Sequence, residues 1–396
     1  MNSYQSVTTR NARARFLLPG KSWRCFVVLL SCACHSLVTN GALAVTWTYH
    51  IVYDEHSVAP ITGYTAPSLN DSGTLAFSAQ VGSTYGIVKG NGGAVTTIAT
   101  EGTTYSKVGP APGINNNGLV VFEANRTNGT TGIFTGDGSG APTAINGSLT
   151  GNFTNDLGIP EINNSGQVAF NAYSGTSLHL YTGSGGTPQL VTNDYAAAGA
   201  DINNSGVIAW SRTSDVSTYS AGVNTVIQST PGIFASFVGA PSINNSGDVA
   251  YAGNLNGGGS ALAIYHAGST SVTATSPGGF TWFRGLAAIN DRGDVAFHAD
   301  TSTYSGIFVG LDPTNAPVLY QGMSLFGGTA GELDFVPHGF NDLGQLAFTY
   351  WLTDGRHGLA TASPPVAVPE PSTFVLAALG LAGLGFLVLR KKYRMA

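Results

Sequence analysis

The 396-residue chain has few charged side chains. Charged residues make up 9% of it, against roughly 25% in an ordinary soluble protein. The formal net charge of −5 offers no basic surface to a phosphate backbone, so we expect no nucleic-acid partner. Hydrophobic residues reach 43% and aromatic residues 10%, which argues against disorder. Low charge combined with 54 glycines is typical of a β-rich protein with many turns.

Cysteine is confined to the N-terminal end, at Cys25, Cys32 and Cys34. The rest of the chain therefore cannot hold a disulfide framework, a CxxC redox site or a Cys-ligated zinc. The histidines show no HxxxH or HExxH spacing, and the sequence contains no GxSxG elbow and no Gly-rich phosphate loop. We therefore expect no metal, no cofactor and no catalytic residues.

Residues 1–44 have the parts of a secretory signal peptide. Five basic residues without an acid precede the apolar run 25–34, which is too short to span a bilayer. Ala42 and Ala44 supply the small residues that a signal peptidase reads, so we expect cleavage after Ala44. Two alternatives stay open: an N-terminal anchor that is retained, and a lipoprotein attached through Cys32.

The other end of the chain combines a short motif, an apolar run and a basic cluster. Pro369, Glu370 and Pro371 lie in the linker 364–372, and the apolar run covers residues 373–389. A helix of that length reaches about 25 Å, so we predict a single transmembrane helix. The tail 390–396 is expected to stay in the cytoplasm because of its basic residues Arg390, Lys391, Lys392 and Arg394.

In this order, the three elements resemble the PEP-CTERM sorting signal. The resemblance implies that an exosortase, a membrane-embedded cysteine protease-transpeptidase, recognises Pro369, Glu370 and Pro371. After signal peptidase has acted, the chain would pass through an inner-membrane intermediate and be cut near the motif. Its body would then reach the cell envelope, the surface or the extracellular matrix of a Gram-negative bacterium.

One nine-residue unit recurs seven times. Its third copy reads Ile162-Asn-Asn-Ser-Gly-Gln-Val-Ala-Phe170, and the glycines of successive copies are 40 to 51 residues apart. The first Asn can bond nearby backbone as in an Asx-turn, and a glycine in every copy indicates a positive φ. We expect structural turns at Asn70, Gly73, Asn115, Gly118, Asn163, Gly166, Asn203, Gly206, Asn244, Gly247, Asn290, Gly293, Asn341 and Gly344.

The unit predicts a strand, a tight turn and a second strand, with the aromatic residue and the Ala before it on opposite faces. Two further apolar segments follow in most copies, and four strands per repeat are typical of propeller blades. We predict an all-β, seven-bladed β-propeller over residues 45–363. Residues 49–53 look like a fourth strand without a blade, and we expect them to complete blade seven. The unit also resembles the NxxGxxAF tandem repeat of bacterial proteins with C-terminal anchors, which implies no activity.

Three candidate sites stay open. Glu161 and Asp201 occupy the same position in adjacent copies, where two carboxylates could contact a glycan or a cation, or act as acid and base. The repeated Asn and Gly could ligate calcium, although each turn supplies few carboxylates. Arg126, Arg212 and Arg284 could form a sialidase-like cluster, although their positions in the repeat differ.

From these features we expect a non-catalytic surface protein whose propeller binds extracellular polysaccharide or another envelope component. The alternative is a glycan-cleaving enzyme on the same scaffold. Sparse acidic residues and the lack of a catalytic motif favour binding.

Overall fold

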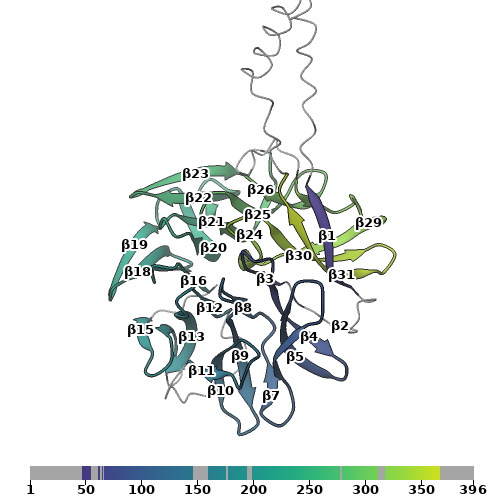
Figure 1. Cartoon of the computed structure of the whole chain (residues 1–396). Coiled ribbons are helices and arrows are strands. Elements are labelled where there is room, and N and C mark those ends of the chain that lie inside the picture. Colours follow the sequence, from purple (N-terminus) through teal and green to yellow (C-terminus); the bar gives the residue numbers. More distant parts are fainter. Residues whose placement is uncertain are drawn as a thin grey trace, which may run out of the picture. The chain divides into compact units, whose positions relative to one another are not determined.

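The computed structural model describes residues 47–54, 61–62, 65, 67–145, 159–174, 177–193, 199–276, 279–310 and 317–365. Residues 46–368 form one compact unit. Within the described ranges the strands form seven antiparallel sheets, which are the blades of a seven-bladed β-propeller (Figure 1). The predicted all-β, seven-bladed fold is confirmed.

The segments predicted at the two ends of the chain lie outside the described residues. At the N-terminal end this is the signal peptide 1–44. At the C-terminal end these are the motif in the linker 364–372, the apolar run 373–389 and the tail 390–396. Among the residues that the structure describes, no helix is long and apolar enough to cross a membrane.

The first four blades follow one another along the chain. Blade one contains β2 (Ile61–Thr62), β3 (Ser68–Leu69), β4 (Leu75–Val81), β5 (Thr84–Gly90) and β6 (Thr96–Thr100). Blade two contains β7 (Tyr105–Val108), β8 (Gly113–Ile114), β9 (Val120–Arg126), β10 (Thr131–Gly136) and β11 (Thr143–Ala144). Blade three contains β12 (Glu161–Ile162), β13 (Val168–Ser174), β14 (Ser177–Gly183) and β15 (Gln189–Thr192). Blade four contains β16 (Ala200–Ile202), β17 (Ile208–Arg212), β18 (Asp215–Ser220) and β19 (Val223–Ser229).

Three blades complete the ring. Blade five contains β20 (Phe234–Ile243), β21 (Val249–Leu255), β22 (Ser260–His266) and β23 (Ser269–Thr275). Blade six contains β24 (Trp282–Ile289), β25 (Val295–Asp300), β26 (Ser305–Val309) and β27 (Leu319–Tyr320). Blade seven contains β28 (Ser324–Leu325), β29 (Gly328–Asp334), β30 (Leu346–Leu352), β31 (His357–Ser363) and the N-terminal strand β1 (Thr48–Asp54).

Strand β1 closes the ring. It pairs antiparallel with β31, with Tyr49 opposite Ala362 and Asp54 opposite Gly358. Figure 1 shows the purple β1 beside the yellow-green β31. The first and the last described strands of the chain thus share one sheet, which covers the outer edge of β31. The predicted closure by residues 49–53 is confirmed.

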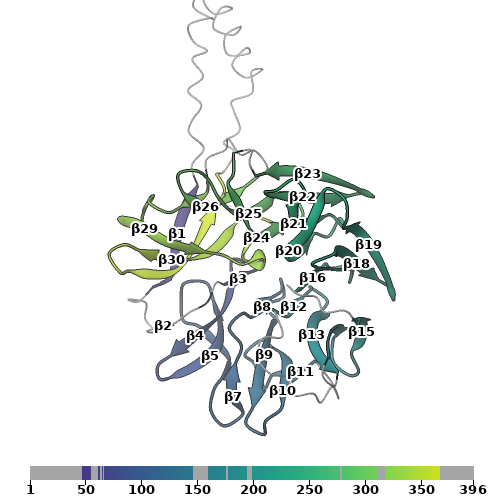
Figure 2. The same ribbon diagram turned by 180° about the vertical axis from the view of Figure 1, so that it is seen from behind.

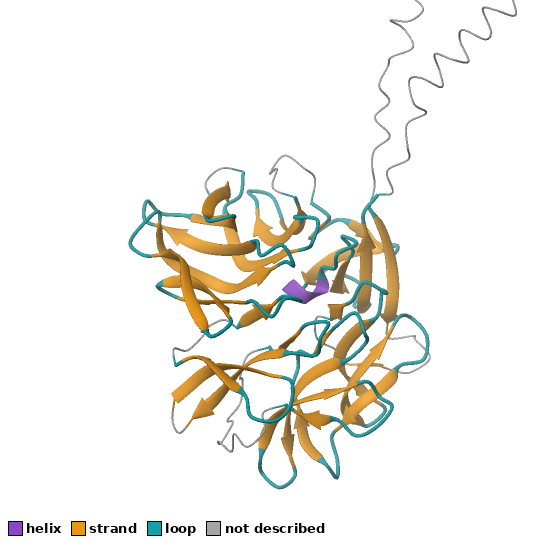
Figure 3. Ribbon diagram, turned by 60° about the vertical axis from the view of Figure 1, so that its left-hand side comes forward, coloured by secondary structure: helices purple, strands orange, loops and turns teal. Residues whose placement is uncertain are grey.

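Short segments surround the axis of the propeller. Each contacts the next in the order β3, β8, β12, β16, β20, β24 and η1 (Pro337–Gly339), and η1 contacts β3 again. Figure 2 shows this arrangement from behind, and Figure 3 shows η1 as a purple segment near the middle of the ring. The innermost positions are therefore where residues from all seven blades meet.

The hydrophobic core lies between the blades. At each interface the Ala of one repeat unit, or Val121 in the second, packs in the same cluster as the aromatic residue of the next unit. Ala169 lies with Trp210, for example, and Ala209 with Tyr251. All seven aromatic residues are at most 2% exposed. A small side chain facing a large one lets neighbouring sheets pack at native density, so both faces of the repeat strand are used.

Candidate functional site

The first asparagine of each repeat organises its own turn. In blade four, Asn203 Oδ1 accepts hydrogen bonds from the backbone N–H groups of Ser205 and Val207 at 3.1 and 3.0 Å. The N–H of Gly206 donates to the Asn203 carbonyl, and Gly206 has a φ of +78°. The seven repeat glycines all have φ between +75° and +86°, so the predicted positive φ is confirmed.

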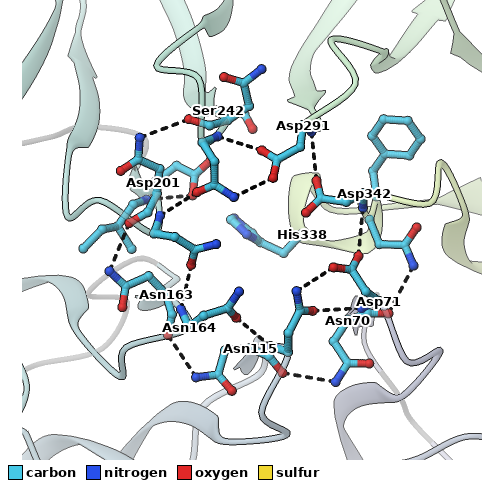
Figure 4. Close-up of a pocket in the computed structure, with 18 of the residues that line it drawn as sticks. Asn70, Asp71, Asn115, Asn163, Asn164, Asp201, Ser242, Asp291, His338 and Asp342 are labelled. Atoms are coloured by element: carbon cyan, nitrogen blue, oxygen red, sulfur yellow. Dashed lines mark hydrogen bonds between the residues drawn. The ribbon is translucent and has the colours of Figure 1, made fainter.

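The amide nitrogen of the same asparagine reaches the next blade. Asn203 Nδ2 donates to the backbone carbonyl of Asn244 at 3.0 Å, and every repeat makes this bond, at 2.9 to 3.2 Å (Figure 4). The donors are Asn70, Asn115, Asn163, Asn203, Asn244, Asn290 and Asn341, and Asn341 donates to Asn70. Seven amides thus form a closed ring of hydrogen bonds, which we call the inner ring because its asparagines are buried.

The second residue of the repeat forms another closed ring, which we call the outer ring because its members are half-buried or exposed. The backbone N–H of Asn204 donates to Asn245 Oδ1 at 2.7 Å, and the seven equivalent bonds measure 2.7 to 3.0 Å. Its members are Asp71, Asn116, Asn164, Asn204, Asn245, Asp291 and Asp342. The bond that closes this ring needs only an oxygen acceptor from each side chain, although Asn116 and Asn245 also donate from Nδ2 to Asp71 and Asp291. This explains why Asn and Asp both occur at the second position, whereas the first position always has Asn.

An ion pair joins two blades near the axis. His338 comes from η1 of blade seven, and its Nε2 lies 2.7 Å from Oε1 of Glu161, which comes from β12 of blade three. Figure 4 shows His338 in the middle of the axial opening. The Glu161 side chain is 4% exposed and that of His338 is 24% exposed. The pair therefore links two blades that are not neighbours in the ring.

Both pKa values in the pair are raised. Burial raises the pKa of Glu161 to about 7, although the charge of His338 acts against this. Burial would lower the pKa of His338, but the charge and hydrogen bond of Glu161 and the charge of Asp201 outweigh it and raise the pKa to about 9. The imidazole is therefore protonated at neutral pH, beside the carboxyl groups of Glu161 and Asp201.

The residue before the repeat Ile joins adjacent blades. Asp201 Oδ2 accepts from the N–H of Ile243 at 2.8 Å, and Asp201 Oδ1 accepts from its own neighbour Ile202 at 2.7 Å. Ser68 and Ser242 accept from the equivalent N–H groups of the next blades, Ile114 and Ile289, both at 3.2 Å. The structure thus places Glu161 and Asp201 together at the axis. Glu161 already contacts His338 there, and Asp201 already accepts hydrogen bonds from two backbone N–H groups. Their contact with a glycan or cation stays a prediction.

A polar cavity of about 150 Å³ lies within the rings. Asp71, Asp291 and Asp342 line it as adjacent members of the outer ring, and burial, with the like charges of Asp291 and Asp71, raises the pKa of Asp342 to about 6. In the described part of the chain, no group of three or more His, Cys, Asp or Glu side chains could hold a metal ion. Calcium ligation by the repeated Asn and Gly is not supported by this geometry, because the Asn oxygens bond backbone N–H groups.

The three arginines of the suggested sialidase-like cluster lie on different blades and have separate partners. Arg126 of blade two lies over the ring of Phe134, 4.8 Å from its centroid. Arg212 of blade four pairs with Asp215 at 2.6 Å. Arg284 of blade six pairs with Asp300. The structure does not bring these guanidinium groups together.

A larger groove lies between blades six and seven, with a volume of about 910 Å³. Strand β24 begins at Trp282 and runs toward the turn at Asn290, and Trp351 lies near the end of β30, which leaves the turn at Asn341. The groove, which we call the tryptophan groove, is thus at the strand ends away from the repeat turns. Trp282 is 48% and Trp351 37% exposed. The polar residues that line it are Arg284, His298, Ser305, Gln321, Glu332 and Asp334.

Of the charged residues that line the tryptophan groove, Arg284 has a carboxylate partner, whereas Glu332 and Asp334 lie beside each other. Arg284 Nε and Nη2 donate to the two carboxylate oxygens of Asp300 at 3.1 and 3.3 Å. Burial, followed by the charge of Arg284, lowers the pKa of His298 to about 4, so its imidazole is neutral; His298 Nε2 lies 3.0 Å from Ser305 Oγ. Burial raises the pKa of Asp334, and the like charge of Glu332 adds to this.

The sequence did not reveal the tryptophan groove. The sequence points to Arg284 only as a member of an arginine cluster, and the two tryptophans occupy non-equivalent positions in their repeats. The signal that could have found His338 is its place directly before the seventh unit, in Pro337-His338-Gly339, where the other copies have no histidine.

These features define a seven-bladed propeller protein with an axial ring site and a peripheral groove. The chain matches the model of the PEP-CTERM protein-sorting motif over residues 367–392 and that of a family of unknown function (DUF7453) over residues 318–375. The sorting motif indicates export through a Gram-negative envelope pathway and is consistent with processing by exosortase. No curated protein matches the sequence. The resemblance of the units to the NxxGxxAF repeat stays a prediction.

Several solved structures are similar to this chain at low identity. An oligogalacturonate lyase from Vibrio parahaemolyticus is 10% identical with a TM-score of 0.51, over 82% of this chain and 98% of that one. A prolyl endopeptidase is 12% identical with a TM-score of 0.49, over 88% of this chain and 56% of that one, so the chain spans just over half of that peptidase. A lectin from Burkholderia pseudomallei is 14% identical with a TM-score of 0.43, over 79% and 99%. At 10% identity, the likeness to the lyase concerns the fold alone.

Proposed function

We propose that the chain is a surface or matrix protein, sorted by exosortase, whose propeller binds polysaccharide without cleaving it. The observation that carries the proposal is the pair of half-exposed tryptophans in one groove with polar side chains. Flat aromatic faces with an adjacent set of hydrogen-bonding groups suit sugar rings, which have apolar C–H faces and polar edges. The volume of about 910 Å³ lies within the range of ligand pockets.

Two features support binding over catalysis. The acids that the repeat places together, Glu161 and Asp201, already hold a histidine and two backbone N–H groups. The inner and outer rings, with seven residues each, hold the axial region in place. The polar atoms of these residues are therefore used in hydrogen bonds that stabilise the fold. The tryptophan groove is the region of the described chain that combines volume, exposed aromatic surface and polar groups.

One observation favours the second candidate function, a glycan-cleaving enzyme. Asp334 and Glu332 line the same groove, and the raised pKa of Asp334 is what a general acid requires. A catalytic role would make these two carboxylates the acid and the base or nucleophile, in place of Glu161 and Asp201.

A glycan-array screen of purified residues 46–368, run beside a polysaccharide turnover assay, tests the proposal. We expect retention of at least one class of bacterial polysaccharide and no release of reducing ends or unsaturated products. Turnover that is lost in Asp334→Asn would establish the enzyme instead. Absence of binding to every glycan would contradict the proposed function.

A further inference from the structure

We propose that the tryptophan groove recognises a cationic glycan, a polysaccharide segment that carries protonated amino sugars. This rests on the proposed function and names the class of polysaccharide. It is carried by the combination of unpaired acids, exposed indole faces and neutral hydrogen-bonding groups in one groove.

The charge balance of the groove is negative. Arg284 is the cation of its lining, and both of its contacts go to Asp300. No salt bridge joins Glu332 or Asp334 to a cation within the described ranges. The two residues stand two positions apart on β29, and both reach the surface. The carboxyl group of Asp334 is nevertheless partly desolvated by its neighbours, which is why its pKa is raised. A cationic ligand would offset their charge, whereas a uronate polymer would be repelled.

The tryptophans favour the same ligand class. The face of an indole ring carries negative electrostatic potential and attracts a cation placed over it. The same face stacks against the C–H groups of a sugar ring. Trp282 lies on blade six and Trp351 on blade seven, so one chain of sugars that follows the groove could contact both. One face of Trp351 is stacked on the ring of His357, with the ring centroids 5.7 Å apart, so a sugar would use its other face or its edge.

The remaining lining groups distinguish an amino sugar from a simple cation. Gln321 and Ser305 are neutral and can bond hydroxyl groups. His298 is 9% exposed, bonds Ser305 and is neutral, so it adds no repulsive charge. A basic peptide would use the acids but would leave these groups without hydroxyl partners. The lining as a whole therefore favours a glycan over a lysine-rich segment.

Calorimetric titration of residues 46–368 tests this. The probes are glucosamine pentamer, the N-acetylated pentamer of the same length, galacturonate pentamer and lysine pentamer. We expect the glucosamine pentamer to bind about tenfold more tightly than its acetylated counterpart, which corresponds to one well-placed cationic interaction. We expect no binding of the galacturonate pentamer.

Variants locate the site. Trp282→Ala should weaken binding of the glucosamine pentamer about fivefold, and Trp282→Phe should restore most of it. Glu332→Gln and Asp334→Asn should each reduce the preference for the unacetylated sugar. Asp137→Asn is the matched control, because it removes the same charge from an exposed site on blade two and should change nothing. Thermal unfolding checks that each variant is folded.

Three results would overturn the proposal. Equal affinity for the two amino-sugar pentamers, lost in Trp282→Ala, would remove the cationic preference and leave polysaccharide binding in place. Lysine pentamer that binds as tightly as glucosamine pentamer, with the same dependence on Trp282, would indicate a peptide site. Failure of every sugar to bind would contradict both this proposal and the proposed function.

Discussion

Nε2 of His338 lies 2.7 Å from Oε1 of Glu161, and this contact joins blade seven to blade three across the axis of the propeller. The two residues are 177 positions apart in the sequence, and neither belongs to the recurring unit. A buried ion pair is costly to break by removing one partner, because the other charge is left without compensation. The pair therefore stabilises the closed propeller by joining two blades that are not neighbours.

The stability of the protein should decrease as the pH rises through the range in which His338 loses its proton. The ordinary pKa of histidine is 6.5 and that of His338 is raised to about 9, so its contribution is complete below pH 6.5 and lost above pH 9. We expect the free energy of unfolding to fall by up to about 3 kcal/mol across this range. Urea unfolding between pH 6 and pH 10 measures it.

His338→Gln should lack this decrease, whereas the control His179→Gln, on β14 of blade three, should keep it. The same pH dependence in the His338→Gln protein and the wild type would show that another group is responsible.

The inner ring should be sensitive to loss of a single amide donor. Asn203→Asp keeps the acceptor for Ser205 and Val207 but places a carboxylate oxygen against the Asn244 carbonyl, 3.0 Å away in the wild type. We expect a loss of about 2–4 kcal/mol in the free energy of unfolding. Asn204→Asp is the matched control, because Asn204 Oδ1 serves the outer ring as an acceptor and Asp stands at three other positions of that ring. This variant should cost under about 0.5 kcal/mol. Equal losses in the two variants would contradict the ring assignment.

The repeat glycine should resist a β-branched side chain. Gly206→Val puts a branched residue at a φ of +78° with its Cβ 2.7 Å from Gln167 Oε1, so we expect a loss of more than about 1 kcal/mol. Gly93→Val serves as control, because Gly93 has no atom within 4 Å of its added Cβ and its φ lies outside the left-handed region. Thermal or urea unfolding compares the two. A loss at Gly206 no larger than that at Gly93 would mean that the turn tolerates any residue.

The C-terminal motif should direct processing rather than insertion. The apolar run and basic cluster suffice for a membrane anchor, so Glu370→Ala should leave the protein in the membrane but with its tail uncut. Intact-mass analysis of envelope-associated protein from the native host distinguishes the forms. If residues 390–396 remain on the wild-type protein at its final location, the motif is not a cleavage signal.

The scaffold could be predicted from the sequence because each blade contains one copy of the same nine-residue unit. The Asn, the Gly three residues later and the strand after it interact within nine residues, and copying them seven times sets the number of blades. The pairing of β1 with β31 followed from counting strands, since residues 49–53 had no blade of their own.

The sites could not be predicted in the same way. His338 meets Glu161 through the curvature of the whole ring, and Trp282 and Trp351 share a groove although they occupy different positions in their repeats. A comparison of the repeats shows the residues that all copies share, whereas these site residues differ from copy to copy. The inner ring could be predicted only in part. Asn stands at the first position of all seven copies because its Nδ2 donates a hydrogen bond, but the carbonyl that accepts this bond lies in the next blade and could not be identified from the sequence.

A crystal structure of residues 46–368 with glucosamine pentamer bound is the most direct test of the account. We predict a sugar ring stacked on Trp282 in the tryptophan groove, with an ammonium group within hydrogen-bonding distance of Glu332 or Asp334. Sugar bound in the axial cavity beside Asp201 and His338, with the tryptophan groove empty, would contradict it.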